Sequence, residues 1–420
     1  MSANEAHRHA GLAAFHHVDF VLYQVERFSV VAALEMQSVA VAWQVYEITR
    51  KPLSLGLVGL AQFLPNVFLF LLAGHAADRF SRKNLLLICN LGFTACSAFL
   101  IEITRAGFDD VRPIYAVLVL LGVARAFNSP AGRSLLPALV PLEVFPSAVA
   151  WNSTTYQTAA ILGPALGGLL YALFRGPAGV YATSMIGCAI ATAALMRIHI
   201  RPSVRRTEEV GLRTILAGFD YIWKHKIILG SISLDLFAVL LGGAVALLPV
   251  YAREILHTGP WGLGLLRAAP GVGASLMAIL LAYQPLRSRV GKVMLMCVAS
   301  FGVFTIIFGV SHSLVLSLLS LMLVGGTDMV SVVVRGTLVQ IATPDSVRGR
   351  VNAVDMIFIG ASNELGEFES GLTAHWFGSV PAVILGGIGT IVVVALWAWI
   401  FPELREADQL TPIQEEPVAV

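Results

Sequence analysis

Residues 357–371 read Ile-Phe-Ile-Gly-Ala-Ser-Asn-Glu-Leu-Gly-Glu-Phe-Glu-Ser-Gly, which places acids inside a run that otherwise suits a membrane helix. The three carboxylates are those of Glu364, Glu367 and Glu369. Ionisable side chains are costly inside a bilayer and are usually functional where they occur. At about 100° per residue, Asn363 and Glu367 share one side of the helix, with Glu364 beside them. We therefore predict a membrane helix that turns polar groups toward a cavity.

This stretch has a counterpart in the first half of the chain. Pro344 matches Pro141 at an offset of 203 (344 − 141 = 203), within a block of similar matches. A second block, which contains Pro270 and Pro65, repeats at an offset of 205 (270 − 65 = 205). Two blocks with nearly equal offsets, each keeping a proline, indicate two halves of the same topology.

The composition is that of a membrane protein. The 420 residues are 57% hydrophobic and only 13% charged, with a mean hydropathy of +0.78, which lies outside the range of soluble globular domains. The net charge of +2 is too small to indicate a nucleic-acid partner. All four cysteines fall in apolar runs, where we expect them to pack as small hydrophobic side chains.

Twelve apolar runs follow the N-terminal segment, each near the roughly 20 residues that a spanning helix needs. Their approximate bounds are 20–48, 53–77, 84–104, 113–136, 145–172, 178–198, 228–254, 260–286, 292–311, 314–338, 348–376 and 380–401. We predict an all-α membrane protein with 12 transmembrane helices in two pseudo-symmetric six-helix bundles. The expected parts are an N-terminal segment (1–17), a first bundle (18–198), a basic linker (199–227), a second bundle (228–402) and a tail (403–420).

The positions of the basic residues predict the orientation. Short loops on the side of the N-terminus carry Arg79, Arg82, Lys83 and Arg348, whereas the opposite loops are poorer in Lys and Arg. Because cytoplasmic loops carry an excess of basic residues, both termini should be cytoplasmic. We interpret the basic linker as a tether that touches anionic lipid rather than as a regulatory site.

The loop between the second and third runs carries a specific motif. Residues 74–83 read Gly-His-Ala-Ala-Asp-Arg-Phe-Ser-Arg-Lys, which resembles the loop signature of the major facilitator superfamily. The resemblance implies that Asp78 forms a latch with a helix N-terminus of the other half, supported by Gly74, Arg79 and Arg82. The alternative is that these charges serve topology alone.

The fifth run contains a glycine-proline motif. The segment Gly163-Pro164-Ala165-Leu166-Gly167-Gly168 is similar to the signature of the exporter branch of the superfamily, although Ala159 stands where glycine is common. Glycines allow close helix approach and Pro164 allows a bend, so the segment is a candidate hinge or seal. Close packing of small residues without a role in transport is the competing interpretation.

Further charges fall inside the predicted membrane helices. Arg125 resembles the buried arginine of the superfamily's fourth span, and its repeat mate is Asp328 (328 − 125 = 203). Other such charges are Glu35, Asp235 and Arg267, and with Asp355 and the acids of residues 357–371 they make the interior more acidic than basic. Buried carboxyls can exchange protons near neutral pH, which proton coupling requires. The alternative is a set of paired charges that specifies helix packing.

The overall pattern, including residues 37–49 and 348–353, is similar to the enterobactin-exporter and macrolide-efflux branch of the superfamily, the transmembrane secretion effectors. The resemblance implies a secondary active exporter of drugs or siderophores in a bacterial inner membrane, with proton antiport by alternating access. The side chains that we expect to line its cavity are Trp43, Gln44, Tyr46, Gln62, Tyr156 and Gln157. An acidic interior suits a cationic or zwitterionic cargo, whereas a siderophore is more anionic, so the cargo class stays open.

Two competing functions remain: a nutrient importer or facilitator on the same fold, and a transport-inactive sensor or assembly partner. No nucleophile triad, metal-ligand spacing or phosphate-binding glycine loop suggests an enzyme, and we expect no cofactor. His7, His9, His16 and His17 are interpreted as part of a solvated tail rather than a metal site. The expected partners are a small-molecule substrate, protons and the lipid bilayer, and we expect a monomer.

Overall fold

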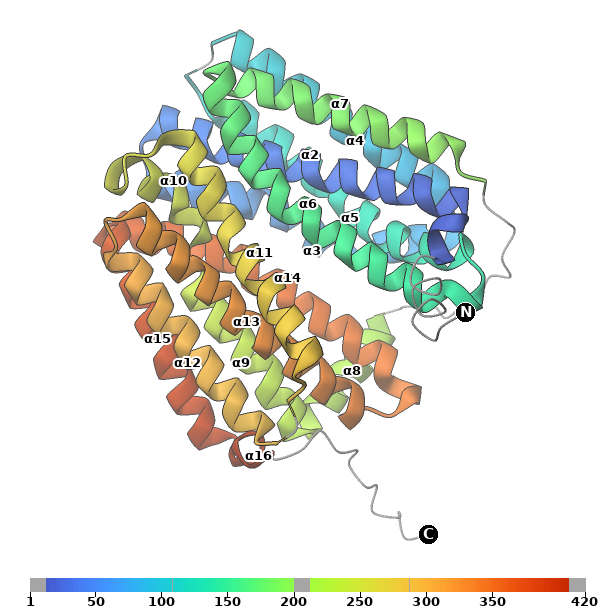
Figure 1. The fold of residues 1–420 in the computed structure, drawn as a ribbon, viewed down its shortest axis with the longest axis vertical. Coiled ribbons are helices and arrows are strands. Elements are labelled where there is room, and N and C mark those ends of the chain that lie inside the picture. Colours follow the sequence, from blue (N-terminus) through green and yellow to red (C-terminus); the bar gives the residue numbers. More distant parts are fainter. Residues whose placement is uncertain (1–12, 108, 200–211, 287, 408–420) are drawn as a thin grey trace, which may run out of the picture. The chain divides into compact units, whose positions relative to one another are not determined.

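The computed structural model is helical throughout the part of the chain that it describes, residues 13–107, 109–199, 212–286 and 288–407 (Figure 1). The long helices are α2 (Val18–Thr49), α3 (Pro52–Arg79), α4 (Arg82–Arg105), α5 (Arg112–Leu135), α6 (Phe145–Phe174), α7 (Pro177–Arg197), α8 (Leu212–Lys224), α9 (Lys226–Gly242), α11 (Gly259–Tyr283), α12 (Val290–Val310), α13 (Leu314–Ala342), α14 (Asp345–Phe377) and α15 (Ser379–Ile400). Short helical turns connect them, namely η1 (Ala13–His16), η2 (Leu136–Ala138), η3 (Leu142–Val144), η4 (Ala244–Leu247), α10 (Leu248–Val250), η5 (Tyr251–Ile255) and α16 (Pro402–Glu406).

Eleven helical segments in the described part of the chain are long and apolar enough to cross a membrane. The all-α membrane fold is thereby confirmed, but the predicted span 348–376 is not among the eleven. It lies in α14, which is a continuous helix of 33 residues. Its length is sufficient, since it measures about 50 Å at 1.5 Å per residue. Its acids lower the hydropathy below that of an ordinary lipid-facing helix, which is the physical reason for the difference.

The chain divides into two compact units. Unit 1 comprises residues 1–50, 60–209 and 257–268, and unit 2 comprises 51–59, 210–256 and 269–420. The start of α3 therefore belongs to unit 2, and the start of α11 belongs to unit 1. The predicted bundles contain complete helices, and their boundaries stay a prediction.

Unit 1 is built around α2. This helix packs against α6 and α7, and α4 packs against α5 and α7. Most of α2 is buried, including Phe20, Val30 and Val39. Burial around most of its circumference places α2 in the interior of unit 1.

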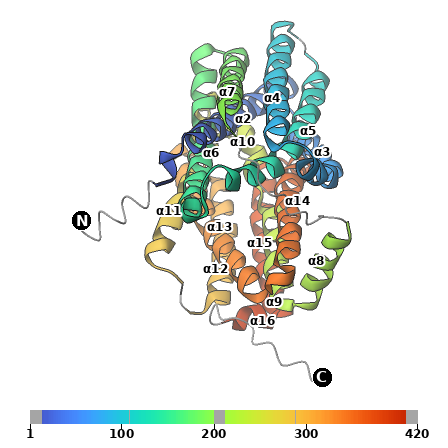
Figure 2. The same ribbon diagram turned by 90° about the vertical axis from the view of Figure 1, so that its right-hand side faces the viewer.

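Unit 2 places α9 against α14 and α15, while α12 packs against α13 and α15 (Figure 2). The predicted span 228–254 was expected to be one helix, but α9 stops before Gly243 and continues as short turns. Gly243 loses more backbone freedom in a helix than other residues do, and Pro249 lacks the backbone N–H of a helical hydrogen bond. Both residues therefore weaken regular helix here. The freed carbonyl oxygen of Gly243 accepts a hydrogen bond from Ser370 Oγ of α14 at 2.6 Å.

The predicted linker contains a helix. Residues 200–211 lie outside the described part of the chain, but α8 follows them and packs beside α14 (Figure 2). Tyr221 donates its hydroxyl to the carbonyl oxygen of Ala342 at 3.0 Å, and the rings of Phe219 and Phe358 lie 5.5 Å apart. The second half of the linker is therefore attached to unit 2.

Candidate functional site

A buried arginine joins three helices of unit 2. Arg335 of α13 is only 3% exposed. Its Nη1 donates to Asp355 Oδ1 of α14 at 2.8 Å, and its Nη2 lies 3.4 Å from Asp235 Oδ2 of α9. A guanidinium presents its donors in a planar fork, so one side chain can hold two carboxylates at once. This cluster links α9, α13 and α14.

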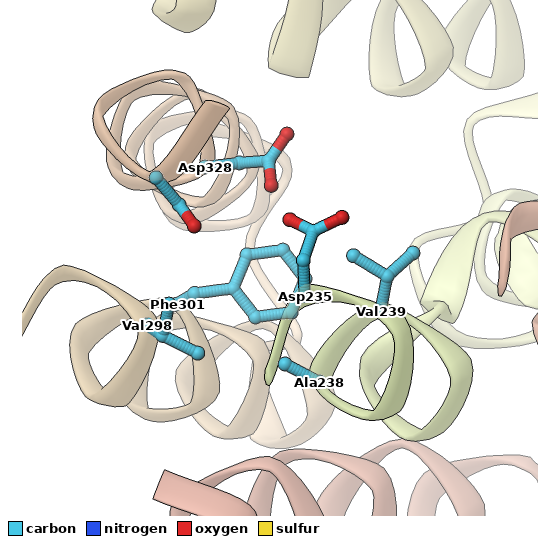
Figure 3. Close-up of a pocket in the computed structure, with 7 residues that line it drawn as sticks. Asp235, Ala238, Val239, Val298, Phe301 and Asp328 are labelled. Atoms are coloured by element: carbon cyan, nitrogen blue, oxygen red, sulfur yellow. The ribbon is translucent and has the colours of Figure 1, made fainter. Parts of the chain in front are cut away.

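A third acid lies close to this cluster. Asp328 stands two helical turns before Arg335 on α13, and it lines a small cavity together with Asp235. Figure 3 shows the two carboxylates projecting toward one another from their helices. The cavity has a volume of about 10 Å³, and its lining residues are Asp235, Ala238, Val239, Val298, Phe301, Asp328 and Ser331. Asp328 itself is half-buried.

The structure thus brings together two predicted site residues, Asp235 and Asp328, and adds one that sequence reasoning missed. Arg335 follows Asp328 by seven residues (335 − 328 = 7), which places both on one face of α13. This spacing of an acid and an arginine on one helix face is the sequence feature that could have identified Arg335.

Glu364, Glu367 and Glu369 of α14 lie in unit 2 and are half-buried. Glu367 packs so closely on the start of α3 that a Cβ added at Gly59 would meet its Oε2 at 2.7 Å. Two of the predicted polar groups form bonds within their own helix: Asn363 Nδ2 donates to Ile359 O at 2.8 Å, and Thr373 Oγ1 donates to Glu369 Oε1 at 2.6 Å. The coupling roles predicted for Glu364, Glu367, Glu369 and Asn363 stay predictions.

The predicted charges of unit 1 are placed on α2, α5 and α11. Arg267 Nη1 of α11 donates to Ser38 Oγ of α2 at 2.7 Å. Glu35 precedes Ser38 by one helical turn and is half-buried, as is Arg125 on α5. Arg125 and its repeat mate Asp328 belong to different units.

A further buried acid of unit 1 was not predicted. Glu26 of α2 is 3% exposed, and its Oε1 accepts a hydrogen bond from Asn90 Nδ2 of α4 at 3.1 Å. Its position early in a long apolar helix, one residue before Arg27, was the signal that could have found it. A carboxyl group buried with an amide partner is a second candidate proton acceptor.

The predicted cavity-lining side chains of unit 1 differ in their surroundings. Gln44 is buried and uses both ends of its amide, since Tyr181 donates to Oε1 at 2.6 Å and Nε2 donates to Thr104 at 3.1 Å. Tyr156 is 44% exposed, with the guanidinium of Arg27 5.1 Å above its ring. Trp43 and Tyr46 are buried, and Gln62 and Gln157 are half-buried. Their contact with substrate stays a prediction.

The glycine-proline motif of α6 packs against two helices of unit 1. A Cβ at Gly163 would lie 2.6 Å from the Cβ of Glu35, and one at Gly167 would lie 2.8 Å from Met36 Cα. On the other side, a Cβ at Gly264 of α11 would lie 2.6 Å from the carbonyl oxygen of Pro164. The motif therefore lets α2 and α11 approach the backbone of α6, as small residues do in membrane helices.

The loop motif holds the ends of two helices in unit 1. Arg82 Nη1 donates to the carbonyl oxygen of Ser134 at 2.7 Å. Lys83 Nζ donates to the carbonyl oxygens of Met196 and Ile198, both at 2.7 Å. Cations at helix C-termini satisfy free carbonyls and interact favourably with the helix dipole. The side chain of Asp78 lies outside the described part of the structure, so its predicted latch stays a prediction.

Replacing Lys83 by methionine should loosen the end of α7. The carbonyls of Met196 and Ile198 lose a charged donor, so we expect amide hydrogen exchange in the last turn to quicken about tenfold, or about 1.4 kcal/mol. Hydrogen–deuterium exchange with mass spectrometry measures this. Lys292→Met, at an exposed lysine in the first turn of α12, is the control. Unchanged exchange at 195–198 would contradict the capping role.

Within the residues that the structure describes, no group of three or more His, Cys, Asp or Glu side chains is arranged to hold a metal ion.

Comparison with known proteins first defines the class. The chain resembles the nucleoside transporter NupG, with a TM-score of 0.69 and 14% identity over 91% of this chain and 99% of that one. It also resembles the D-xylose-proton symporter, with a TM-score of 0.68 and 14% identity over 94% of this chain and 100% of that one. These likenesses show the major facilitator fold.

The family follows from a match over residues 10–419 to the model described as "Transmembrane secretion effector". The chain belongs to this family of secondary transporters within the major facilitator superfamily, and it is not an enzyme. The enterobactin exporter EntS of Citrobacter koseri is 27% identical over 414 residues, which cover 95% of each chain. The enterobactin exporter EntS of Shigella boydii is also 27% identical, over 94% of this chain and 95% of its own.

Proposed function

We propose that the protein is a secondary active exporter that moves small amphiphilic molecules out of a bacterial cell in exchange for protons. The observation that carries the proposal is the similarity to the enterobactin exporters over nearly the whole length of both chains. A full-length likeness includes every helix that lines a transport path, so it supports export better than the fold alone does.

The charges within the helices support proton coupling. Asp235 and Asp355 pair with one arginine in unit 2, Asp328 lines a cavity with Asp235, and Glu26 of unit 1 is buried with an amide. Carboxyl groups in such surroundings can take up and release protons as a transporter changes its access.

The proposed location is the bacterial cytoplasmic membrane, with both termini in the cytoplasm. The relatives named above come from bacteria, and the basic loops on the side of the N-terminus support this orientation. A C-terminal fusion to a reporter that is active only in the cytoplasm tests it.

Transport in everted membrane vesicles tests the proposal. The cytoplasmic face is outside in such vesicles, so an exporter should accumulate its cargo inside when a proton gradient is applied. We suggest two probes: enterobactin, an anionic siderophore, and ethidium, an amphiphilic cation. Accumulation that stops when an uncoupler is added supports proton-driven export. Gradient-driven loss of a preloaded probe would instead indicate import, and no movement of either probe would contradict export of these classes.

Substitution of Glu364 and Glu367 by glutamine tests the predicted coupling role of α14. If these acids carry protons, the initial rate of gradient-driven accumulation should fall at least about tenfold in the double variant. The reason is that a glutamine amide does not take up a proton near neutral pH. The measurement is the initial rate of probe uptake in everted vesicles, corrected for the amount of protein in the membrane. Asp220→Asn, in the exposed ion pair with Lys224, is the matched control. Unchanged transport and pH dependence would remove both residues from the coupling scheme.

Asp78→Asn tests the latch. If the carboxylate interacts with a helix dipole of the other half, its loss should slow turnover severalfold while the amount of protein in the membrane stays the same, because such interactions contribute about 0.3–2 kcal/mol. The rate of probe uptake per molecule is the measurement. An unaltered rate would reduce the motif to a topology signal.

A further inference from the structure

The charges around Arg335 do not balance within unit 2. Asp235 and Asp355 pair with its guanidinium, and Asp328 faces Asp235 across the cavity. With all three acids ionised, the cluster carries a net charge of −2 (one positive minus three negative). Removing ions from water costs several kcal/mol each unless they are paired, so this cluster favours the uptake of positive charge.

Among the ion pairs of the described residues, Arg335 is the one cation joined to these acids. Helix α9 packs against α8, α12, α13, α14, α15 and α16, and α13 also packs against α11, where a Cβ at Gly325 would meet the carbonyl oxygen of Pro270. On α11, Arg267 donates to Ser38 Oγ, and on α14 Arg348 and Arg350 lie near the helix start, before Asp355.

Helix α15 has no charged residue, and the one basic residue of α12, Lys292, lies in its first turn. On α14, Glu364 and Glu367 follow Asp355 by more than two turns and add negative charge. A bound ligand of positive charge would therefore lower the electrostatic cost of this cluster.

An independent feature of the cavity points to that ligand. Ser331 lines the cavity and is 1% exposed, and its Oγ has no hydrogen-bond partner among the residues that the structure describes. A buried hydroxyl without a partner costs about 1–3 kcal/mol, so such a group usually serves a ligand or a water. The cavity volume of about 10 Å³ is close to that of one water-sized sphere.

We infer that Asp328 takes up and releases the coupling proton, and that Asp235 and Ser331 complete the proton site across the cavity. The inference rests on the proton-coupled transport proposed above and names the site that serves it. Asp235 and Asp355 share the guanidinium of Arg335, whereas no ion pair joins Asp328 to another described residue. Asp328 is therefore the acid of this group that is left to bind a proton. Asp328 is half-buried, whereas Asp235 is 6% exposed.

The ligand is a proton rather than a metal cation. Hard cations such as Ca²⁺ and Mg²⁺ take about six or more oxygen ligands. Only Asp235, Asp328 and Ser331 bring side-chain oxygens to this cavity, and its other four lining side chains are hydrocarbons. A proton needs one carboxylate oxygen to bind and a neighbouring hydroxyl to orient it.

The proton step is a simple transfer. A hydronium ion gives its proton to the carboxylate of Asp328, which leaves a neutral acid and a water molecule, while Arg335 stays cationic. Neutralising Asp328 removes its repulsion of Asp235, so the pair between Asp235 and Arg335 is strengthened. Because this pair joins α9 to α13, the protonation state changes the force between two helices of unit 2.

Infrared difference spectroscopy of the reconstituted full-length protein tests the inference without a substrate. Spectra recorded between about pH 5 and pH 9 report carboxyl groups that change protonation. The wild type should show a band of a protonated carboxylic acid that is lost in Asp328→Asn and kept in Asp328→Glu. Ser331→Ala should shift the pH midpoint of the band, because the acid loses its neighbouring hydroxyl. Asp220→Asn should leave the band as it is.

Three outcomes would overturn the inference: a band that persists in Asp328→Asn, a band lost only in Asp235→Asn, and a band that sodium chloride removes at constant pH. The last would indicate a cation site. The Asp328→Glu variant guards against loss of the band through misfolding, since it keeps the acid. Failure of the proposed export is separate: it would appear as absent probe uptake in vesicles whose protein still shows the band.

Discussion

Replacing Arg335 by glutamine should lower the free energy of unfolding by about 3 kcal/mol or more, because Asp235 and Asp355 are then buried without a cation. We expect the midpoint of thermal unfolding in detergent to fall accordingly. The loss should shrink as the pH is lowered, since the orphaned carboxylates then bind protons and their charge disappears.

Two further variants make this test specific. Arg405→Gln, in an exposed pair with Glu406, should change stability little, because exposed ion pairs contribute about 0–1 kcal/mol. A triple variant that also carries Asp235→Asn and Asp355→Asn should recover part of the lost stability. The two carboxylates that Arg335 neutralised are then replaced by uncharged amides. Equal stability of Arg335→Gln and the wild type would show that the cluster is not a structural unit.

Replacing Gly168 by alanine should destabilise unit 1 by about 2 kcal/mol, and valine should be worse, because the added carbon overlaps backbone atoms. A Cβ at this position would lie 2.5 Å from the carbonyl oxygen of Pro260 and 2.8 Å from Gly264 Cα. Backbone atoms of a packed helix cannot rotate away as a flexible side chain can. The expected result is a lower midpoint of thermal unfolding and less protein in the membrane.

The control for Gly168 is another helical glycine of unit 1. A Cβ at Gly92 would meet its nearest neighbour, Ala124 Cβ, at an ordinary 3.6 Å. Gly92→Ala should therefore be neutral or stabilising by up to about 1 kcal/mol, because alanine favours helix. Equal effects of the two substitutions would argue against close packing at Gly168.

Much of the fold could be predicted because the signals are local. Lengths of apolar runs predicted the helices, and the loop motif at 74–83 and the glycines of α6 indicated the superfamily. The end of regular helix before Gly243 was not predicted. The hydropathy stays high across this point, and hydropathy carries no information on where the backbone hydrogen bonds of a helix break. The same holds for α14, whose acids reduce its hydropathy although it forms one long helix.

The candidate site was predicted in part. Asp235 and Asp328 were predicted as acids within membrane helices, but the sequence pattern gave more weight to Glu364 and Glu367, which lie three residues apart on one helix (367 − 364 = 3). Arg335 was missed because it follows an apolar run near a predicted helix end, where a basic residue is ordinarily a topology signal. Its burial shows otherwise.

The sequence by itself determined that this protein is a helical membrane transporter. Runs of about 20 apolar residues are favourable as helices in a lipid bilayer, and the motifs typical of transporters are short segments that can be found without knowing the fold. The tertiary structure alone decided which charges meet. Arg335 draws its partners Asp235 and Asp355 from helices 120 residues apart in the chain (355 − 235 = 120), and helical periodicity does not specify such contacts. Whether a buried acid is paired or open to a proton depends on distances of a few ångströms, which only packing sets.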